Sequence, residues 1–140
     1  MTLKNLEKLA ASGQLKEEPM DQAEFHGLIH SGNARLNDAH RDVLSLESRF
    51  DLAYNAAHVL ALAALRWNGY RSDSRYLVFQ CLPHTLGAGP EVWRMLAHCH
   101  GIRNRGEYDG IYDIDEQLIT DLIKATEQVL EALENLGPVP

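Results

Sequence analysis

The strongest constraint on the fold is SRFDLAYNAAHVLALAALRWNGY, residues 48–70, which is apolar almost all the way round a helical wheel. A helix that is apolar on every side has to be surrounded by other elements. Either Ser45 or Ser48 can cap its start, and Asn68-Gly69 is a common helix stop. We therefore expect this helix at the centre of the fold, with the rest of the chain packed around it.

Three further segments repeat apolar residues at the three-and-four spacing of a helix. The first starts near Asp21 and presents one apolar face: Phe25, Leu28, Gly32, Leu36, Ala39 and Val43. The second opens at residues 89–91, where proline and glutamate suit a first turn, and ends at Ile102. The third follows a predicted capping box of Asp113 and Glu116. Each segment predicts a helix, and Gly32 indicates close packing within the first.

Two shorter segments complete the expected fold. The sequence RYLVFQCL at 75–82 favours a short helix over a strand, with Ser72 or Asp73 as its cap. Residues 1–19 predict a peripheral helix and linker, and residues 20–140 predict the main domain. The expected class is all-α, an antiparallel bundle of about five helices.

Composition supports a stable core and argues against a membrane protein. With 140 residues, 45% of them hydrophobic, the chain can bury a core without a metal or disulfide. Its longest apolar run, 56–65, is too short to span a bilayer and contains His58. The N-terminus lacks the apolar core of a secretory signal, so we expect a cytoplasmic protein. Cys81 and Cys99 follow no ligand spacing and predict buried free thiols.

Charge is distributed unevenly along the chain, whose net charge is −7. Residues 66–105 hold six arginines against two acids, whereas nine acids from Glu107 onward face Lys124 alone. This argues against nucleic-acid binding over the whole surface and indicates a local basic region. Solvated helix faces would produce the same pattern, and both interpretations remain open.

The densest polar segment is HCHGIRNRGEYDG, residues 98–110, where we expect a helix to give way to a loop. Arg103 and Arg105 carry planar guanidinium groups that suit phosphate, and Asn104 and Tyr108 add neutral hydrogen-bonding groups. This combination indicates an anion or nucleotide site. The alternative is that both arginines pair with helix C-terminal carbonyls or with the acidic tail.

A polar row on the central helix predicts further residues of that site. Asp51, Asn55 and His58 lie at i, i+4 and i+7, and therefore share one face of an otherwise apolar helix. Because unpaired buried polar groups are costly, we expect partners, with the segment after Ile102 as their source. Asp51 and Asn55 also suit a purely architectural network, whereas His58 either supports the site or titrates within it.

No motif indicates a metal or a cofactor, and we expect neither. His26 and His30 have i, i+4 spacing, and His98 and His100 lie two apart, but further ligands and the HExxH signature are absent. Residues 86–90 lack the lysine and Ser/Thr of a P-loop. No nucleophile elbow or Ser-His-Asp arrangement can be identified.

The central helix and the polar segment together resemble the HEPN superfamily of helical domains associated with nucleotides and RNA. The resemblance covers roughly residues 20–136 and rests on RFDLAYNAAHVLALAALRWNGYR and HGIRNRGEYDG. It implies a HEPN-like bundle that forms a homodimer. The ribonuclease members cleave RNA without a metal, using an arginine, often followed by asparagine, and a histidine a few residues later. Two such motifs meet across the dimer.

Arg103 and Asn104 match this motif, but its histidine position is occupied by Tyr108. The resemblance implies that Arg103 stabilises phosphate charge. Tyrosine, with an ordinary pKa of about 10, is a poor general base at neutral pH, although it can hydrogen-bond or stack on a base. His98 or His100 would be the substitute, outside the family pattern. The sequence therefore leaves open whether the chain cleaves RNA or only binds it.

Three functions are carried forward as expectations. The first is a HEPN-like homodimer that binds RNA or a nucleotide, and cleaves RNA in a toxin-antitoxin or defence setting. The second is an adaptor or substrate partner of a minimal nucleotidyltransferase, with Tyr108 as a possible nucleotide acceptor. The third is an interaction module in which residues 103–110 only hold helices together.

Overall fold

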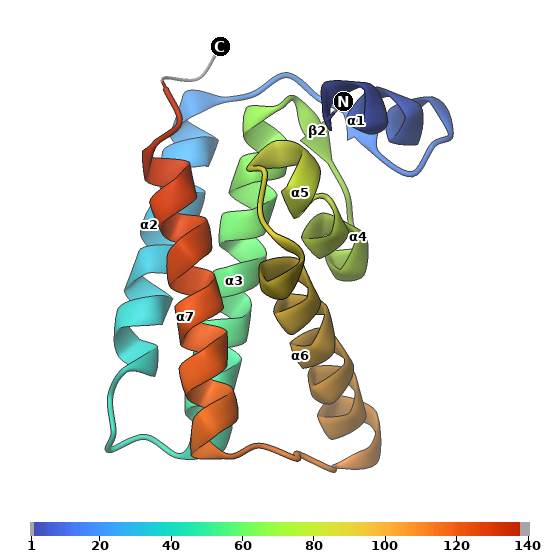
Figure 1. Ribbon diagram of the computed structural model, residues 1–140. Helices are drawn as coiled ribbons and strands as arrows, with labels where there is room; N and C mark the ends of the chain where they lie inside the picture. The colour runs from blue at the N-terminus through green and yellow to red at the C-terminus, as the bar shows by residue number, and fades with distance from the viewer. Residues whose placement is uncertain (1, 138–140) are drawn as a thin grey trace.

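The computed structural model describes residues 2–137, which form seven helices and one small sheet. Four helices are long: α2 (Gln22–Ala39), α3 (Leu46–Trp67), α6 (Pro90–Asp109) and α7 (Glu116–Glu134). Three are short: α1 (Thr2–Ala11), α4 (Arg75–Gln80) and α5 (Leu82–Thr85). Successive long helices run in opposite directions (Figure 1). The expected all-α antiparallel bundle is confirmed, and segment 75–82 spans two short helices because Pro83 starts a new one.

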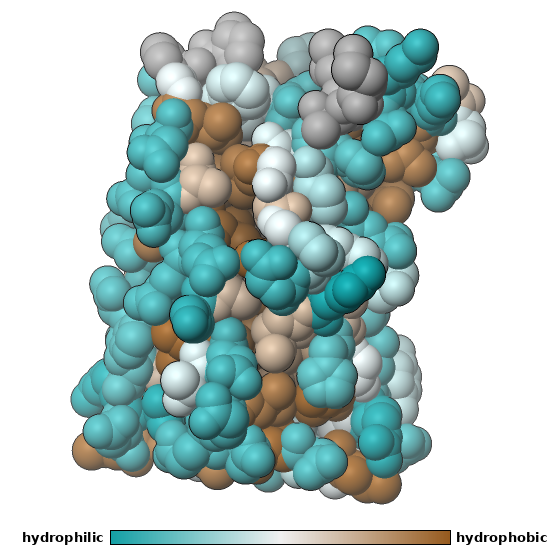
Figure 2. All heavy atoms as spheres, viewed as in Figure 1, coloured by the Kyte–Doolittle hydropathy of each residue, from teal (hydrophilic) through white to brown (hydrophobic). Residues whose placement is uncertain are grey.

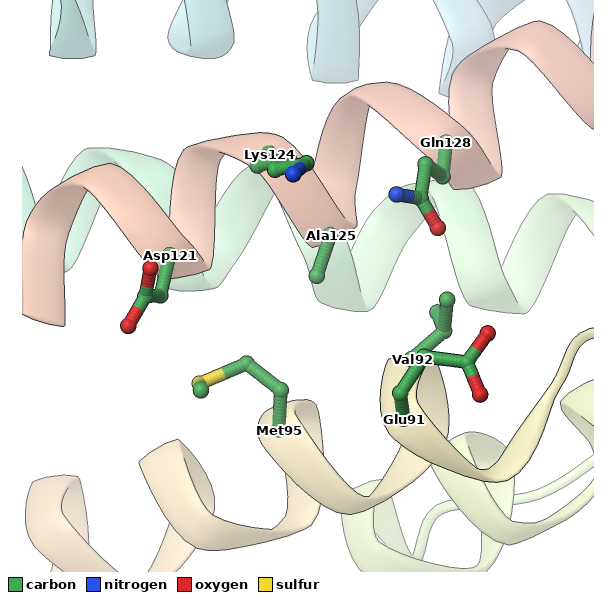
Figure 3. A pocket seen from close by; sticks show the side chains of 7 residues that line it. All are labelled: Glu91, Val92, Met95, Asp121, Lys124, Ala125 and Gln128. Atoms are coloured by element: carbon green, nitrogen blue, oxygen red, sulfur yellow. The ribbon is translucent and has the colours of Figure 1, made fainter.

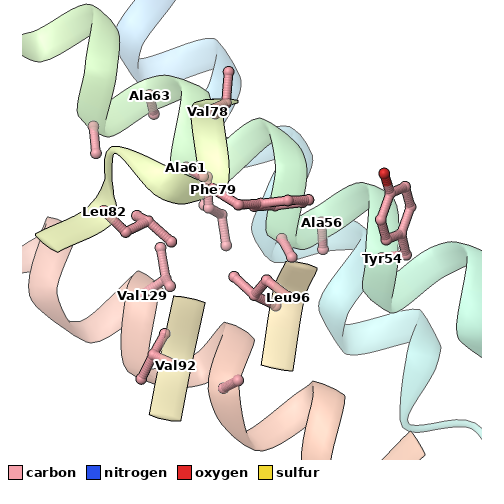
Figure 4. Packing of buried hydrophobic residues seen from close by; sticks show 14 of the residues in the cluster. Tyr54, Ala56, Ala61, Ala63, Val78, Phe79, Leu82, Val92, Leu96 and Val129 are labelled. Carbon is pink, nitrogen blue, oxygen red and sulfur yellow. The ribbon is translucent and has the colours of Figure 1, made fainter. Parts of the chain in front are cut away.

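Helix α3 lies at the centre of the bundle, as its apolar composition predicts. It packs against α2, α4, α5, α6 and α7. Figure 4 shows Tyr54 and Ala61 of α3 among side chains from α4, α5, α6 and α7. Six alanines of α3 are at most 1% exposed, and they allow close approach of its neighbours: Ala53, Ala56, Ala57, Ala61, Ala63 and Ala64.

Local contacts explain where α2 and α3 begin and why they lie close together. The Asp21 side chain accepts a hydrogen bond from the Ala23 N–H at 3.1 Å. Ser45, rather than Ser48, caps α3 by accepting from the Ser48 N–H at 3.1 Å. Gly32 of α2 is buried, and a Cβ there would lie 2.5 Å from Leu60 Cγ of α3. The close packing expected at Gly32 is therefore present.

Two helix ends differ from the expectation. Helix α2 stops at Ala39, so Val43 is 83% exposed instead of facing the core. Helix α6 continues through Asp109, so the residues from Arg103 onward are helical rather than a loop. The helix stops only at Gly110, whose φ of +71° is the left-handed conformation typical of a helix stop.

Two predicted caps also lie elsewhere. Helix α7 starts after Asp115, whose side chain accepts from the Leu118 N–H at 2.8 Å, and Asp113 does not cap it. Helix α4 is capped by Ser74, which accepts from the Leu77 N–H at 3.2 Å. Ser72 instead accepts a hydrogen bond from the Ser74 N–H in the preceding turn.

The N-terminal segment joins the bundle through α1 and a two-stranded sheet. Helix α1 packs against α5 and buries Leu6 completely. Strands β1 (Lys16–Glu17) and β2 (Tyr70–Arg71) pair in antiparallel register. Two residues per strand leave no alternating pattern to detect, so the sequence did not indicate this sheet.

A charge cluster fixes this junction. Arg66 is 1% exposed and donates to Glu24 Oε1 at 2.6 Å and to the backbone oxygens of Glu18 and Pro19 at 2.8 Å each. Arg71 pairs with the carboxylates of Glu18 and Glu24. Two of the six arginines in the basic middle of the sequence are therefore neutralised at this junction, and they do not contribute to an anion site.

Two further expectations concern the cysteines and the membrane. Cys81 and Cys99 are buried free thiols, as predicted, and burial raises the pKa of Cys81 to about 11 and that of Cys99 to about 12. Among residues 2–137, no helix combines the length and the apolar character needed to cross a bilayer.

Candidate functional site

Tyr54 of α3 is the centre of a polar cluster where α3, α4 and α6 meet. The residue is fully buried, and its ring stacks on Phe50 at 6.1 Å and meets Phe79 edge-on at 5.9 Å. Its hydroxyl lies 2.9 Å from His100 Nδ1 of α6. Tyr54 therefore links the apolar core to the polar groups around it, and burial raises the pKa of its hydroxyl.

Two arginines approach the same tyrosine ring. The guanidinium carbons of Arg75, the first residue of α4, and Arg103 of α6 each lie 5.5 Å from the Tyr54 ring centroid. This distance is typical of a cation–π contact. Arg75 also donates to Asn55 Oδ1 at 3.1 Å, and Arg103 pairs with Glu107 at 3.3 Å. Glu107 offsets part of the Arg103 charge, whereas Arg75 pairs with no carboxylate among residues 2–137. The two guanidinium groups beside one ring therefore keep a positive charge that suits an anion with several oxygens.

His100 joins the two sides of this cluster. Its Nδ1 contacts the Tyr54 hydroxyl, and its Nε2 lies 3.2 Å from Asn104 Nδ2, one turn further along α6. Partial burial and the charges of Arg103 and Arg75 lower the pKa of His100. The imidazole is therefore neutral at neutral pH, and it is oriented by hydrogen bonds at both ring nitrogens.

The polar row Asp51, Asn55 and His58 borders this cluster. Desolvation raises the pKa of the Asp51 carboxyl, and Arg103 acts in the opposite direction. Asn55 donates to the backbone oxygen of Asp51 at 2.8 Å and receives its other hydrogen bond from Arg75. The partner of Asn55 thus comes from α4, and not from the segment after Ile102 as expected.

His58 lies deeper in the same row, against the Phe79 ring at 6.3 Å. Burial, followed by the charges of Arg75 and Arg103, lowers its pKa to about 4. His58 is consequently neutral over the physiological range. It shapes the base of the cluster and does not supply a positive charge.

Two residues expected at the site lie away from this cluster. Arg105 is exposed on another face of α6, in a pocket that also includes Asp113 and Asp121. Tyr108 is 81% exposed beyond the cluster. Tyr108 lies five helical positions after Arg103, which places their side chains roughly 140° apart around α6. The structure therefore brings Arg103 and Asn104 together with the polar row, but not Arg105 or Tyr108.

Sequence reasoning missed Tyr54 and Arg75. Tyr54 follows Asp51 by three residues and precedes His58 by four, so helical spacing places it in the polar row. Its position inside an apolar run made it resemble a core residue. Arg75 carries no such signal, because its approach to Asn55 depends on how α4 packs against α3.

The described part of the chain contains no group of three or more His, Cys, Asp or Glu side chains arranged to hold a metal ion. The cluster instead offers guanidinium, imidazole, phenol and amide groups, which together can hold and polarise a phosphate without a metal. Comparison with protein-family models, with curated proteins and with solved structures finds no match for this chain.

Proposed function

We propose that this protein is a HEPN-like RNA- or nucleotide-binding protein of the cytoplasm, and that two copies form its binding cleft. The observation that carries the proposal is the convergence of Arg75 and Arg103 on the Tyr54 ring, each at 5.5 Å. Their guanidinium groups would hold phosphate oxygens, and Tyr76, 44% exposed beside His100, would stack on a base. The resemblance of the α3 and α6 segments to the HEPN superfamily supports the same ligand class.

A metal-independent cleavage of RNA in a toxin-antitoxin or defence setting belongs to this proposal. The ribose 2′-oxygen would attack the adjacent phosphorus and break its bond to the 5′-oxygen. Once its Nε2 is released from Asn104, His100 would accept the 2′-hydroxyl proton, and Arg103 would stabilise the phosphate charge. A water molecule would protonate the departing 5′-oxygen, and the imidazolium of His100 would return its proton to the solvent. His100 replaces the motif histidine here, because it contacts Tyr54 and Asn104 within the cluster, whereas Tyr108 lies outside it.

The binding test compares arginines on two faces of α6. Fluorescence anisotropy with labelled single-stranded RNA and with ATP should show at least tenfold weaker binding for Arg103→Ala and for Arg75→Ala. Arg105→Ala removes the same charge from the other face and should change binding less than threefold. Equal losses of affinity at Arg103 and Arg105 would show that binding depends on the net charge of the protein and not on this cluster. No binding by the unaltered protein would overturn the proposal.

Cleavage is tested separately. Labelled RNA incubated with the protein and EDTA should yield ends with 2′,3′-cyclic phosphate, and these ends should disappear with Arg103→Ala. His100→Gln retains hydrogen-bonding groups but cannot take up the proton, so we expect it to bind RNA without cleaving it. Uncleaved RNA with the unaltered protein would leave the binding proposal standing and exclude the nuclease.

The proposed cleft between two copies of the chain is tested by the mass of the protein in solution. Multi-angle light scattering at micromolar concentration should give the mass of two chains, about twice the 15.7 kDa of one. A single-chain mass under the conditions of RNA binding would contradict the dimer, because one cluster would then bind alone.

A second candidate function rests on the exposure of Tyr108. A phenol that is 81% exposed at the end of a helix is accessible to a modifying enzyme. We propose as the alternative that Tyr108 accepts a nucleotide from a minimal nucleotidyltransferase, for which the gene next to this one is the first place to search. Labelled nucleotide incorporated by that enzyme should be lost in Tyr108→Phe and kept in Tyr76→Phe, and retention in both variants would contradict it.

A further inference from the structure

A groove runs along the junction of α6 and α7, on a different face of α6 from the Arg103 cluster. Three adjoining pockets form it. The pocket beside residues 86–89 shares Glu91, Val92 and Gln128 with the middle pocket. The middle pocket shares Met95 and Asp121 with the pocket beside residues 113–118. Figure 3 shows the middle pocket, a hollow of about 220 Å³ with Met95 and Val92 of α6 facing Ala125 of α7.

The groove is long enough for a helix of a partner protein. Its α7 side extends from Gln117 to Ala132, which at 1.5 Å per residue is about 23 Å, or about four helical turns. Figure 1 shows α6 diverging from α7 toward the Asp109 end, while α7 stays beside α3. Within the part of the chain that the structure describes, no helix covers the outer side of this junction.

The floor of the groove is apolar. Val92, Ala125 and Val129 form its buried part, and the partly exposed Met95 and Leu118 continue it. Figure 2 shows this floor as a band of hydrophobic atoms between hydrophilic side chains on either side. An apolar floor between polar rims is the geometry that accepts the apolar face of an amphipathic helix.

The rim of the groove is acidic. Four carboxylates line it, against Lys124 and Arg105: Glu91, Asp113, Asp115 and Asp121. None of the four takes part in an ion pair among residues 2–137. A second copy of this chain is a poor occupant, because its net charge of −7 would bring further acids to this rim.

We propose that the α6–α7 groove binds a basic amphipathic helix of a partner protein. The helix would place apolar residues at i, i+4, i+7 and i+11 on the floor, and lysine or arginine along both edges beside Glu91 and Asp121. The site is independent of RNA or nucleotide binding, since it uses neither Arg75 nor Arg103.

The test uses two fluorescent helical peptides of the same length. Each carries leucine at i, i+4, i+7 and i+11, and the edge positions are lysine in one and glutamate in the other. In fluorescence anisotropy with the full chain, the lysine peptide should bind at least tenfold more tightly than the glutamate peptide. Amide chemical-shift changes should map to the α6 and α7 residues that line the groove.

Matched charge reversals locate the site. Asp121→Lys should weaken binding of the lysine peptide at least fivefold and bring the two peptides closer in affinity. Asp38→Lys makes the same charge change at an exposed position of α2 and should alter binding less than twofold. Circular dichroism checks that both variants fold.

Three results would overturn the proposal: no binding of the lysine peptide, equal binding of both peptides, or shift changes outside the groove. A homodimer that Asp121→Lys dissociates in light scattering would also overturn it, because the occupant would then be a second copy of this chain.

Discussion

At the scale of single residues, Gly32 and Gly27 differ although both lie in α2. A Cβ at Gly32 would lie 2.5 Å from Leu60 Cγ, whereas a Cβ at Gly27 would meet nothing within 4 Å. We expect Gly32→Ala to cost about 1–2 kcal/mol of unfolding free energy, since overpacking exceeds the gain in helix propensity. Gly27→Ala should stabilise by about 0.5–1 kcal/mol. Urea denaturation measures both, and shifts in the same direction would contradict this packing.

His58 makes stability depend on pH. Its pKa of about 4 lies below the ordinary value of 6.5, which the unfolded chain regains. As pH falls from 6.5 toward 4, the unfolded state therefore takes up a proton that the folded state does not, and stability is lost. Above pH 6.5 this contribution is constant.

The measurement is the slope of unfolding free energy against pH between 6.5 and 4. His58→Phe should reduce that slope by at most about 1.4 kcal/mol per pH unit, the limit for one proton. Equal slopes in the unaltered chain and His58→Phe would show that His58 titrates normally.

The residues of the candidate cluster differ in how far the sequence predicted them. Helical spacing placed Asp51, Asn55 and His58 on one face, because that follows from 3.6 residues per turn alone. The role of Arg75 depends on where α4 packs, and that of His100 on the continuation of α6 past Ile102, which places Asn104 beside it. Such contacts come from tertiary structure, which one sequence's periodicity does not specify. The cluster's function stays a prediction.

At the scale of elements, the start of α7 shows how two similar signals can be confused. Asp113 and Glu116 have capping-box spacing, but Asp115 is the observed cap. We expect Asp115→Ala to cost about 1 kcal/mol, because the Leu118 N–H loses its acceptor. Asp113→Ala should cost less than about 0.5 kcal/mol, as is usual for an exposed residue. Urea denaturation compares them, and a larger loss at Asp113 would contradict the assignment.

Long periodic segments predicted the four long helices, because each repeats its apolar face over several turns. The end of α6 was not predicted, because the apolar repeat stops at Ile102 and the polar side chains that follow resemble a loop. In the fold residues 103–109 are helical, and a Cβ at Gly106 would clash with the Tyr112 ring. Gly106 therefore leaves room for the Tyr112 ring inside the helix. This contact depends on the folded structure and cannot be read from the sequence.

At the scale of the whole molecule, Arg66 joins the N-terminal segment to the bundle. We expect Arg66→Met to cost about 3–5 kcal/mol, because Glu24 and two backbone oxygens lose a buried cationic partner. Arg35→Met, at an exposed position of α2, should change stability by less than about 0.5 kcal/mol. Thermal and urea denaturation test this, and a small effect of Arg66→Met would show that the junction contributes little to folding.

The buried alanines of α3 limit which substitutions this protein can accept during evolution. Each of its six buried alanines is at most 1% exposed, so nearly every substitution adds volume where none is free. We therefore expect the central helix to tolerate fewer substitutions than the outer helices. Acquired variation, and with it any change of ligand or partner, should concentrate on the outward faces of α4, α6 and α7.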